Sequence, residues 1–144
     1  MVGGVSGTDP ILAMKRLERL AYKAGYHHVY VVAEGDKRTG PCKIGVADRP
    51  HHRMSGMQTG TPRLLKLVQY WRTPGPPASL RVERAAHLIL AEYKIRGEWF
   101  SVGQKRACKA VESALQDEGV HVVDDKRLMA DTGYGPDGLA VMET

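Results

Sequence analysis

Two runs of strand-forming residues with a turn between them constrain the fold more than any other feature of this chain. Residues 28–33 carry β-branched and aromatic side chains at both odd and even positions, which is typical of a strand buried on both faces. Residues 34–41 are rich in glycine, proline and charged residues, as turns are. Residues 42–47 then return as a second strand, so the pattern predicts an antiparallel hairpin.

Helical spacing and capping residues predict the elements around the hairpin. Asp9 and Pro10 are typical of the start of a helix, which we expect over residues 10–24. Asp48 is predicted to cap a short helix that ends at Gly60. We further expect a third strand over 64–71, a long helix over 80–95 opened by Ser79, another helix over 104–118, and a short edge strand over 120–123.

This order predicts an α/β fold of the α+β kind, with a small three-stranded antiparallel sheet flanked by helices. The 144 residues suit one main domain. We expect an N-terminal arm and helix over residues 1–25, a central domain over 26–118, and an acidic, glycine-rich C-terminal tail over 119–144. The composition of residues 124–144 predicts that this tail is loose.

The charge distribution favours a nucleic acid as the partner. The chain has a formal net charge of +5, and residues 34–100 alone contain twelve basic and six acidic side chains. A basic surface attracts a phosphate backbone because binding releases the counterions of the nucleic acid. We therefore consider nucleic acid as the first partner; the alternative is that many globular proteins of this size are mildly basic.

Cysteine, histidine and hydropathy patterns exclude or weaken other classes. Cys42 and Cys108 are the two cysteines, which excludes a disulfide framework and a four-cysteine zinc site and favours a cytoplasmic location. No apolar run approaches the roughly 18 residues of a membrane span, so we expect no membrane partner. Residues 27–28 and 51–52 are pairs of histidines, but their spacing is not that of metal ligands. A zinc-dependent structural protein, which rests only on these pairs, is therefore kept as a third hypothesis.

Tyr30 and Lys43 are candidates for acid–base chemistry because they fall on the two strands of the predicted hairpin. A neighbouring ammonium favours phenolate over phenol and lowers a tyrosine pKa, which is about 10 when unperturbed. The alternative is a core tyrosine near a surface lysine. Arg53, on the helix after the hairpin, either offers a planar fork to phosphate oxygens or is a solvated surface arginine.

Glu83 and His87 lie four residues apart and therefore share one face of the predicted long helix. A carboxylate suits Mg²⁺, and a neutral imidazole suits zinc or can orient a water molecule. Arg81 and Arg84 make this face basic, as a phosphate site would be. The alternative is an ordinary pair of surface side chains on a helix.

The order of these residues resembles the plan of the GIY-YIG nuclease superfamily. Tyr30 stands in a first strand motif, Lys43-Ile44-Gly45 forms a second, and Arg53 follows Gly45 by eight residues. The resemblance covers residues 28–100. Three further segments are similar to a phage and bacterial branch of the family: Met57-Gln58-Thr59-Gly60-Thr61-Pro62 (Q-T-G-x-P), Glu83-Arg84-Ala85-Ala86-His87, and Gly97-Glu98-Trp99-Phe100 (G-E-W-F).

The resemblance implies a metal-dependent endonuclease that hydrolyses phosphodiester bonds of DNA to 5′-phosphate and 3′-hydroxyl ends. Tyr30 would be the general base, and Arg53 would hold the scissile phosphate and stabilise its developing charge. Glu83 would bind one Mg²⁺ or Mn²⁺ ion, which acts as a Lewis acid. Lys43 stands where the family usually has a tyrosine and would hydrogen-bond Tyr30 or a phosphate. His87 would orient water, support the metal or contact a phosphate.

The nuclease hypothesis implies further contacts and leaves one alternative. A family asparagine that supports the metal region has no clear match, and Glu98 or Trp99 lies near its place. The alternative is a non-catalytic DNA-binding or protein-inhibiting module on the same scaffold. The N-terminal helix and the C-terminal extension are expected to supply either contacts or a homodimer surface. The side chains expected to contact DNA are Arg49, His52, Arg63 and Arg84.

Overall fold

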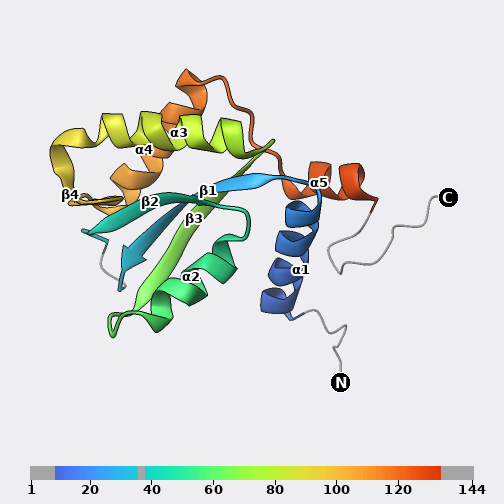
Figure 1. Ribbon diagram of the computed structural model, residues 1–144, viewed down its shortest axis with the longest axis horizontal. Coiled ribbons are helices and arrows are strands. Elements are labelled where there is room, and N and C mark those ends of the chain that lie inside the picture. Colours follow the sequence, from blue (N-terminus) through green and yellow to red (C-terminus); the bar gives the residue numbers. More distant parts are fainter. Residues whose placement is uncertain (1–8, 36–37, 134–144) are drawn as a thin grey trace.

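The predicted hairpin forms the centre of the sheet in the computed structural model, which describes residues 9–35 and 38–133 (Figure 1). Strand β1 (His27–Glu34) pairs antiparallel with β2 (Cys42–Ala47), and this register places Tyr30 opposite Gly45. On its other edge β1 pairs antiparallel with β3 (Leu65–Thr73). The centre of β1 is buried on both faces, as the sequence predicts.

Within the part of the chain that the structure describes, the sheet has five strands rather than the expected three. Strands β4 (Lys94–Arg96) and β5 (Trp99–Phe100) extend it beyond β2, giving the order β3-β1-β2-β5-β4. The expectation of a helix over 80–95 is wrong at its C-terminal end, because α3 (Pro76–Ile89) stops and a 3₁₀ turn (Ala91–Tyr93) leads into β4. The backbone of residues 94–100 finds its hydrogen-bond partners through the pairing of β5 with β2 and of β4 with β5. The predicted α+β class is confirmed, with a larger sheet than expected.

The two faces of the sheet are covered by different helices (Figure 1). Odd positions of β1, such as Val29 and Val31, pack with α3 and α4 (Gln104–Asp117). Even positions, Tyr30 and Val32, pack on the side of α2 (Pro50–Thr59). This alternation is the ordinary geometry of a strand, and it directs Tyr30 away from the main core.

Two helix starts differ from the sequence-based expectation. Asp48 does not cap α2: the N-cap residue is Arg49, which makes no side-chain capping bond, and Pro50 opens the helix. Ser79 does not open α3, which begins three residues earlier at Pro76. Proline fits the first position of a helix because the missing N–H has no partner there in any case. Ser79 is instead buried, with its hydroxyl 2.6 Å from His27 Nδ1.

Helices α1 (Pro10–Lys23) and α5 (Asp125–Thr132) pack together beside the sheet (Figure 1). Asp9 caps α1 as predicted, since its carboxylate accepts from the N–H of Ile11 at 3.0 Å. Leu128 of α5 is fully buried in a cluster with Leu17, Leu20 and Ala21. The expectation of a loose tail is therefore wrong for residues 124–133, and its remaining part, 134–144, lies outside the described residues.

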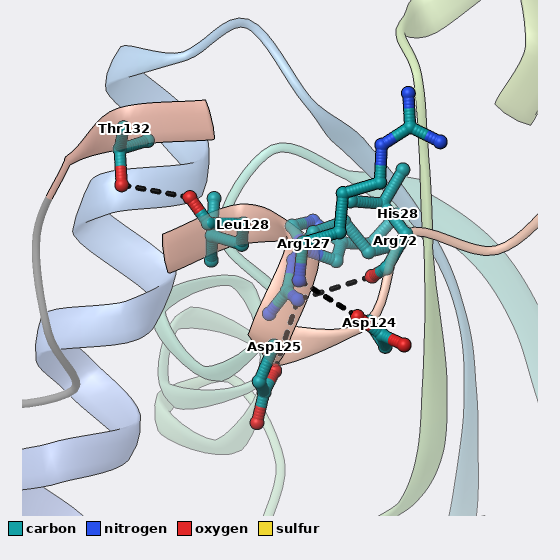
Figure 2. Close-up of polar contacts among 8 residues, drawn as sticks. His28, Arg72, Asp124, Asp125, Arg127, Leu128 and Thr132 are labelled. Atoms are coloured by element: carbon teal, nitrogen blue, oxygen red, sulfur yellow. Dashed lines mark hydrogen bonds and ion pairs between the residues drawn. The ribbon is translucent and has the colours of Figure 1, made fainter. Parts of the chain in front are cut away.

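A buried arginine fastens α5 to the sheet (Figure 2). Arg72 of β3 is only 3% exposed and donates to His28 Nε2 at 3.3 Å, to the Val123 carbonyl at 3.2 Å and to the Asp125 carboxylate at 3.0 Å. In return the N–H of Val123 donates to the Arg72 carbonyl at 2.8 Å. The expected strand over 120–123 is thus reduced to one backbone hydrogen bond at the edge of β3.

Among the described residues, none of the helices has the length and apolar character needed to cross a membrane.

Candidate active site

Side chains from β1, β2, α3 and the turn between β4 and β5 meet above Gly45 of β2. A Cβ atom placed on Gly45 would lie 2.5 Å from the hydroxyl oxygen of Tyr30 and 3.1 Å from Glu98 Oε1. The absence of a side chain at this position therefore leaves the space in which a phenol and a carboxylate approach each other. Lys43, two residues earlier on β2, extends its ammonium to within 3.5 Å of Glu98 Oε1. Glu83 of α3 joins the group beside Glu98.

Tyr30 is held as a phenol by these surroundings. It is 1% exposed, and burial together with the charge of Glu98 raises its pKa to about 12. The charge of Arg53 acts in the opposite direction with a smaller effect. The sequence predicts a lowered Tyr30 pKa through Lys43, and the structure has the reverse because burial, and after it the charge of Glu98, disfavours the phenolate. Tyr30 therefore keeps its proton near neutral pH and can donate a hydrogen bond.

Glu83 carries an unpaired oxygen in a partly buried place. Its Oε2 atom is buried and has no hydrogen-bond partner. Burial, followed by the charge of Glu98 and a side-chain hydrogen bond with it, raises the pKa of Glu83 to about 7, while Arg84 and Lys43 oppose this shift. Two carboxyl groups that share one lysine leave a surplus of negative charge when both are ionised. The site therefore favours binding of either a proton or a cation.

His87 is anchored to the backbone of the sheet. Its Nε2 atom lies 2.9 Å from the Ile44 carbonyl oxygen. A carbonyl only accepts, so Nε2 carries the proton. The edge-to-face contact with the Phe100 ring, at 4.9 Å between centroids, fixes the imidazole further. His87 thus ties α3 to β2 and positions the helix that carries Glu83.

The sequence was compared with family models, curated proteins and solved structures. The model of the T5orf172 domain matches residues 27–116, which is more than half of the chain. The chain belongs to the T5orf172 domain family. No curated protein and no solved structure matches it.

The T5orf172 match contains the whole sheet and all the side chains that meet above Gly45. It begins at the first residue of β1 and ends one residue before the last residue of α4. Helices α1 and α5 both lie outside it. The candidate site is therefore a property of the family region, and the pair of helices beside the sheet is an addition to it.

The other predicted site residues of the T5orf172 region are distributed around this cluster. Arg53 is exposed on α2, and no other described side chain forms an ion pair or hydrogen bond with it. Arg63 lines a cavity of about 360 Å³ together with Lys43 and Trp99, and it pairs with Glu34 at 2.7 Å. The structure thus brings an arginine and a lysine to one cavity beside the cluster. The predicted DNA contacts Arg49 and His52 lie at a different cavity, between α1 and α2.

The Q-T-G-x-P segment has a structural role in this domain. The Gln58 side chain donates to the Arg63 carbonyl at 2.8 Å and accepts from the Leu65 N–H at 2.8 Å. It therefore closes the loop between α2 and β3 from the inside. This explains why a glutamine suits the position, since its amide can donate and accept at once.

Glu98 is the member of the site to which the sequence assigned no role. The sequence placed Glu98 or Trp99 near a missing family asparagine, and nothing in the pattern indicated that residue 98 faces Glu83. The position of Glu98 follows from the pairing of β5 with β2, which sets the next residue, Trp99, opposite Lys43. Strand pairing between segments 56 residues apart cannot be inferred from local spacing.

The zinc hypothesis gains no support within residues 9–35 and 38–133, where no group of three or more histidine, cysteine, aspartate or glutamate side chains could hold a metal ion. His27 and His28 are adjacent on a strand, so their side chains point to opposite faces. His27 contacts Ser79, whereas His28 contacts the Ala47 carbonyl and Arg72.

Proposed function

We propose that this protein is a metal-dependent DNA endonuclease of the GIY-YIG type. The observation that carries the proposal is the meeting of Tyr30, Lys43, Glu83 and Glu98 above Gly45, with a buried Glu83 oxygen left unpaired. A phenol, an ammonium and two carboxyl groups at one point are expensive to assemble for stability alone. Such groups are typical of sites that carry out acid–base or metal-dependent chemistry.

A divalent cation fits the donor set of this site. The unpaired Glu83 Oε2 atom and the neighbouring Glu98 carboxyl group offer hard oxygen ligands, which Mg²⁺ and Mn²⁺ prefer. Glu83 would hold the ion, with Glu98 beside it. When bound, such an ion supplies Lewis-acid stabilisation of the negative charge on the leaving 3′-oxygen.

The remaining residues have separate tasks in the proposed hydrolysis. Arg53 has no partner among the described side chains, so its guanidinium is available to hold the scissile phosphate. Tyr30 keeps its proton in this setting, because burial and, after it, the negative charge of Glu98 raise its pKa. It would act as a general base only where these effects are offset. The products are a 5′-phosphate and a 3′-hydroxyl end.

The proposal is tested by nicking of supercoiled plasmid DNA with Mg²⁺ or Mn²⁺. Glu83→Gln and Arg53→Ala should each reduce the rate by roughly 100-fold or more, as expected when a group that stabilises transition-state charge is lost. Glu92→Gln and Arg16→Ala are matched controls, because both residues are exposed and stand outside the cluster. Equal rates for the site variants and the controls would show that the site is wrongly assigned.

The burial of Tyr30 favours one alternative, a DNA-binding module that does not cleave. Such a module would bind plasmid DNA and show no nicking with either cation, in the wild type as in the variants. If both strands of a duplex are cut, two such sites are needed, and a homodimer is then part of the proposal.

A further inference from the structure

A second cavity lies between α1 and α2 and is separate from the cluster above Gly45. It has a volume of about 230 Å³. Most of its polar lining is basic, and it combines a helix outside the T5orf172 match with a helix inside it. The residues that line it are Lys15, Glu18, Arg19, Arg49, His51, His52 and Ser55.

The single carboxylate of this cavity is already engaged. Glu18 is 7% exposed, and its Oε1 atom accepts from the backbone N–H of His51 at 2.6 Å. The same oxygen lies 3.4 Å from His51 Nδ1 without forming a hydrogen bond to it. Lys15, Arg19 and Arg49 contribute three positive charges against this one negative charge. The cavity therefore keeps a positive surplus even with both histidines neutral.

The lysine and arginine side chains that line the cavity have no anionic partners among the described residues. Lys15 and Arg19 are four residues apart on α1, a spacing at which like charges face each other and repel. Neither forms an ion pair with another described residue. The guanidinium of Arg49 lies over the Tyr22 ring, 4.8 Å from its centroid, and its buried Nε atom has no hydrogen-bond partner. A bound anion would relieve the repulsion and satisfy this donor.

His51, which lines the cavity, and Arg53, the proposed phosphate contact, lie on different sides of α2. Arg53 follows His51 by two positions and therefore lies roughly 200° further around the helix. A nucleic acid held by Arg53 at the cluster above Gly45 presents further phosphates along its backbone. We infer that the cavity between α1 and α2 binds a backbone phosphate of nucleic acid, as a second contact outside the reacting site. The choice of nucleic acid as the source of the phosphate rests on the proposed function.

The experiment compares two double variants with the same change in charge on the same helix. Lys15→Ala with Arg19→Ala removes two cations from the cavity, whereas Arg16→Ala with Lys23→Ala removes two exposed cations of α1 that do not line it. Binding to a fluorescein-labelled duplex is measured with a chelator present, so that no cleavage occurs, over a series of salt concentrations. Thermal unfolding of each variant verifies that it is folded.

The cavity variant should bind about 10-fold more weakly than wild type, with a salt dependence reduced by roughly one phosphate contact, while the control variant stays within about twofold. Equal weakening of the two variants would mean a general charge effect and would overturn the inference, as would wild-type binding by the cavity variant. Inorganic phosphate is the second probe. If it raises the unfolding temperature of wild type and of the control variant but not that of the cavity variant, while both variants bind DNA as wild type does, the cavity takes a free anion instead.

This readout is independent of the nicking assay. A difference in binding between the two double variants without any nicking supports the cavity and contradicts the proposed endonuclease. Nicking that depends on Glu83, together with equal DNA binding by the two double variants, supports the proposed endonuclease and contradicts the phosphate site in the cavity.

Discussion

Protonation of His28 is expected to destabilise the protein as the pH falls below about 6.5. His28 is fully buried, with Nδ1 3.3 Å from the Ala47 carbonyl and Nε2 accepting a hydrogen bond from Arg72 at 3.3 Å (Figure 2). Both ring nitrogens are thus used by the neutral tautomer that carries its proton on Nδ1. A second proton would have to sit on Nε2 and face the Arg72 guanidinium. Burial first, and then the charge of Arg72, lowers the His28 pKa to about 4.

The size of the effect follows from the difference between the folded and unfolded pKa values. The unfolded chain binds the proton at about 6.5 and the folded chain at about 4, so the unfolded state is favoured as the pH falls between them. The full contribution is present above pH 6.5. About 2 kcal/mol of unfolding free energy is lost by pH 5, and about 3 kcal/mol by pH 4.

Urea unfolding at pH 7 and pH 5 measures this loss. The unfolding free energy of wild type should fall by about 2 kcal/mol more than that of His28→Gln, which has no titrating ring at this position. His121→Gln is the control, because His121 is exposed. NMR titration of the His28 ring gives the folded pKa directly. Equal pH dependence in wild type and His28→Gln, or titration of the ring near 6.5, would refute the reasoning.

Three further predictions concern the site and the C-terminal helix. Glu98→Gln removes the charge beside Tyr30, so the Tyr30 pKa should fall from about 12. The phenolate absorbance of Tyr30 is obtained by subtracting the absorbance of a variant that also carries Tyr30→Phe. In a pH titration it should appear at lower pH in Glu98→Gln than in the control Glu92→Gln. Gly45→Ala should cost about 1–3 kcal/mol in urea unfolding, because its Cβ would press on the Tyr30 hydroxyl, whereas Gly56→Ala, with open space around it, should not destabilise. Leu128→Ala should cost about 2–4 kcal/mol in the same assay and should weaken the packing of α5 on α1, with exposed Leu88→Ala as control.

The hairpin and most helices are predictable because their signals are local. A run of β-branched residues, turn residues and a returning strand lie within 28–47, and Asp9 with Pro10 marks α1. Strands β4 and β5 carry no such signal, since Ile95 continues the apolar spacing of the preceding helix. Their conformation is decided by hydrogen bonding to β2, which is distant in sequence.

The C-terminal helix illustrates the same limit from composition. Residues 124–144 are acidic and glycine-rich, and this composition predicts a loose segment, yet the structure has a packed helix within 124–133. Two non-local interactions overcome that tendency: Leu128 inserts into the apolar face of α1, and Asp125 pairs with the buried Arg72. Each partner lies more than 50 residues away in the sequence, so the composition of the segment could not reveal them.

The candidate site depends on the same kind of contact. The sequence placed Tyr30 near Lys43, and from those two residues alone the phenol pKa should fall. Burial raises the Tyr30 pKa instead, and Glu98, which pairing of β5 with β2 brings near and which pairs with the lysine, adds to the rise. The same carboxylate stands beside the unpaired oxygen of Glu83. In the proposed nuclease, a cation held between Glu83 and Glu98 would therefore also ease ionisation of Tyr30, which would couple cation binding to activation of the phenol through Glu98.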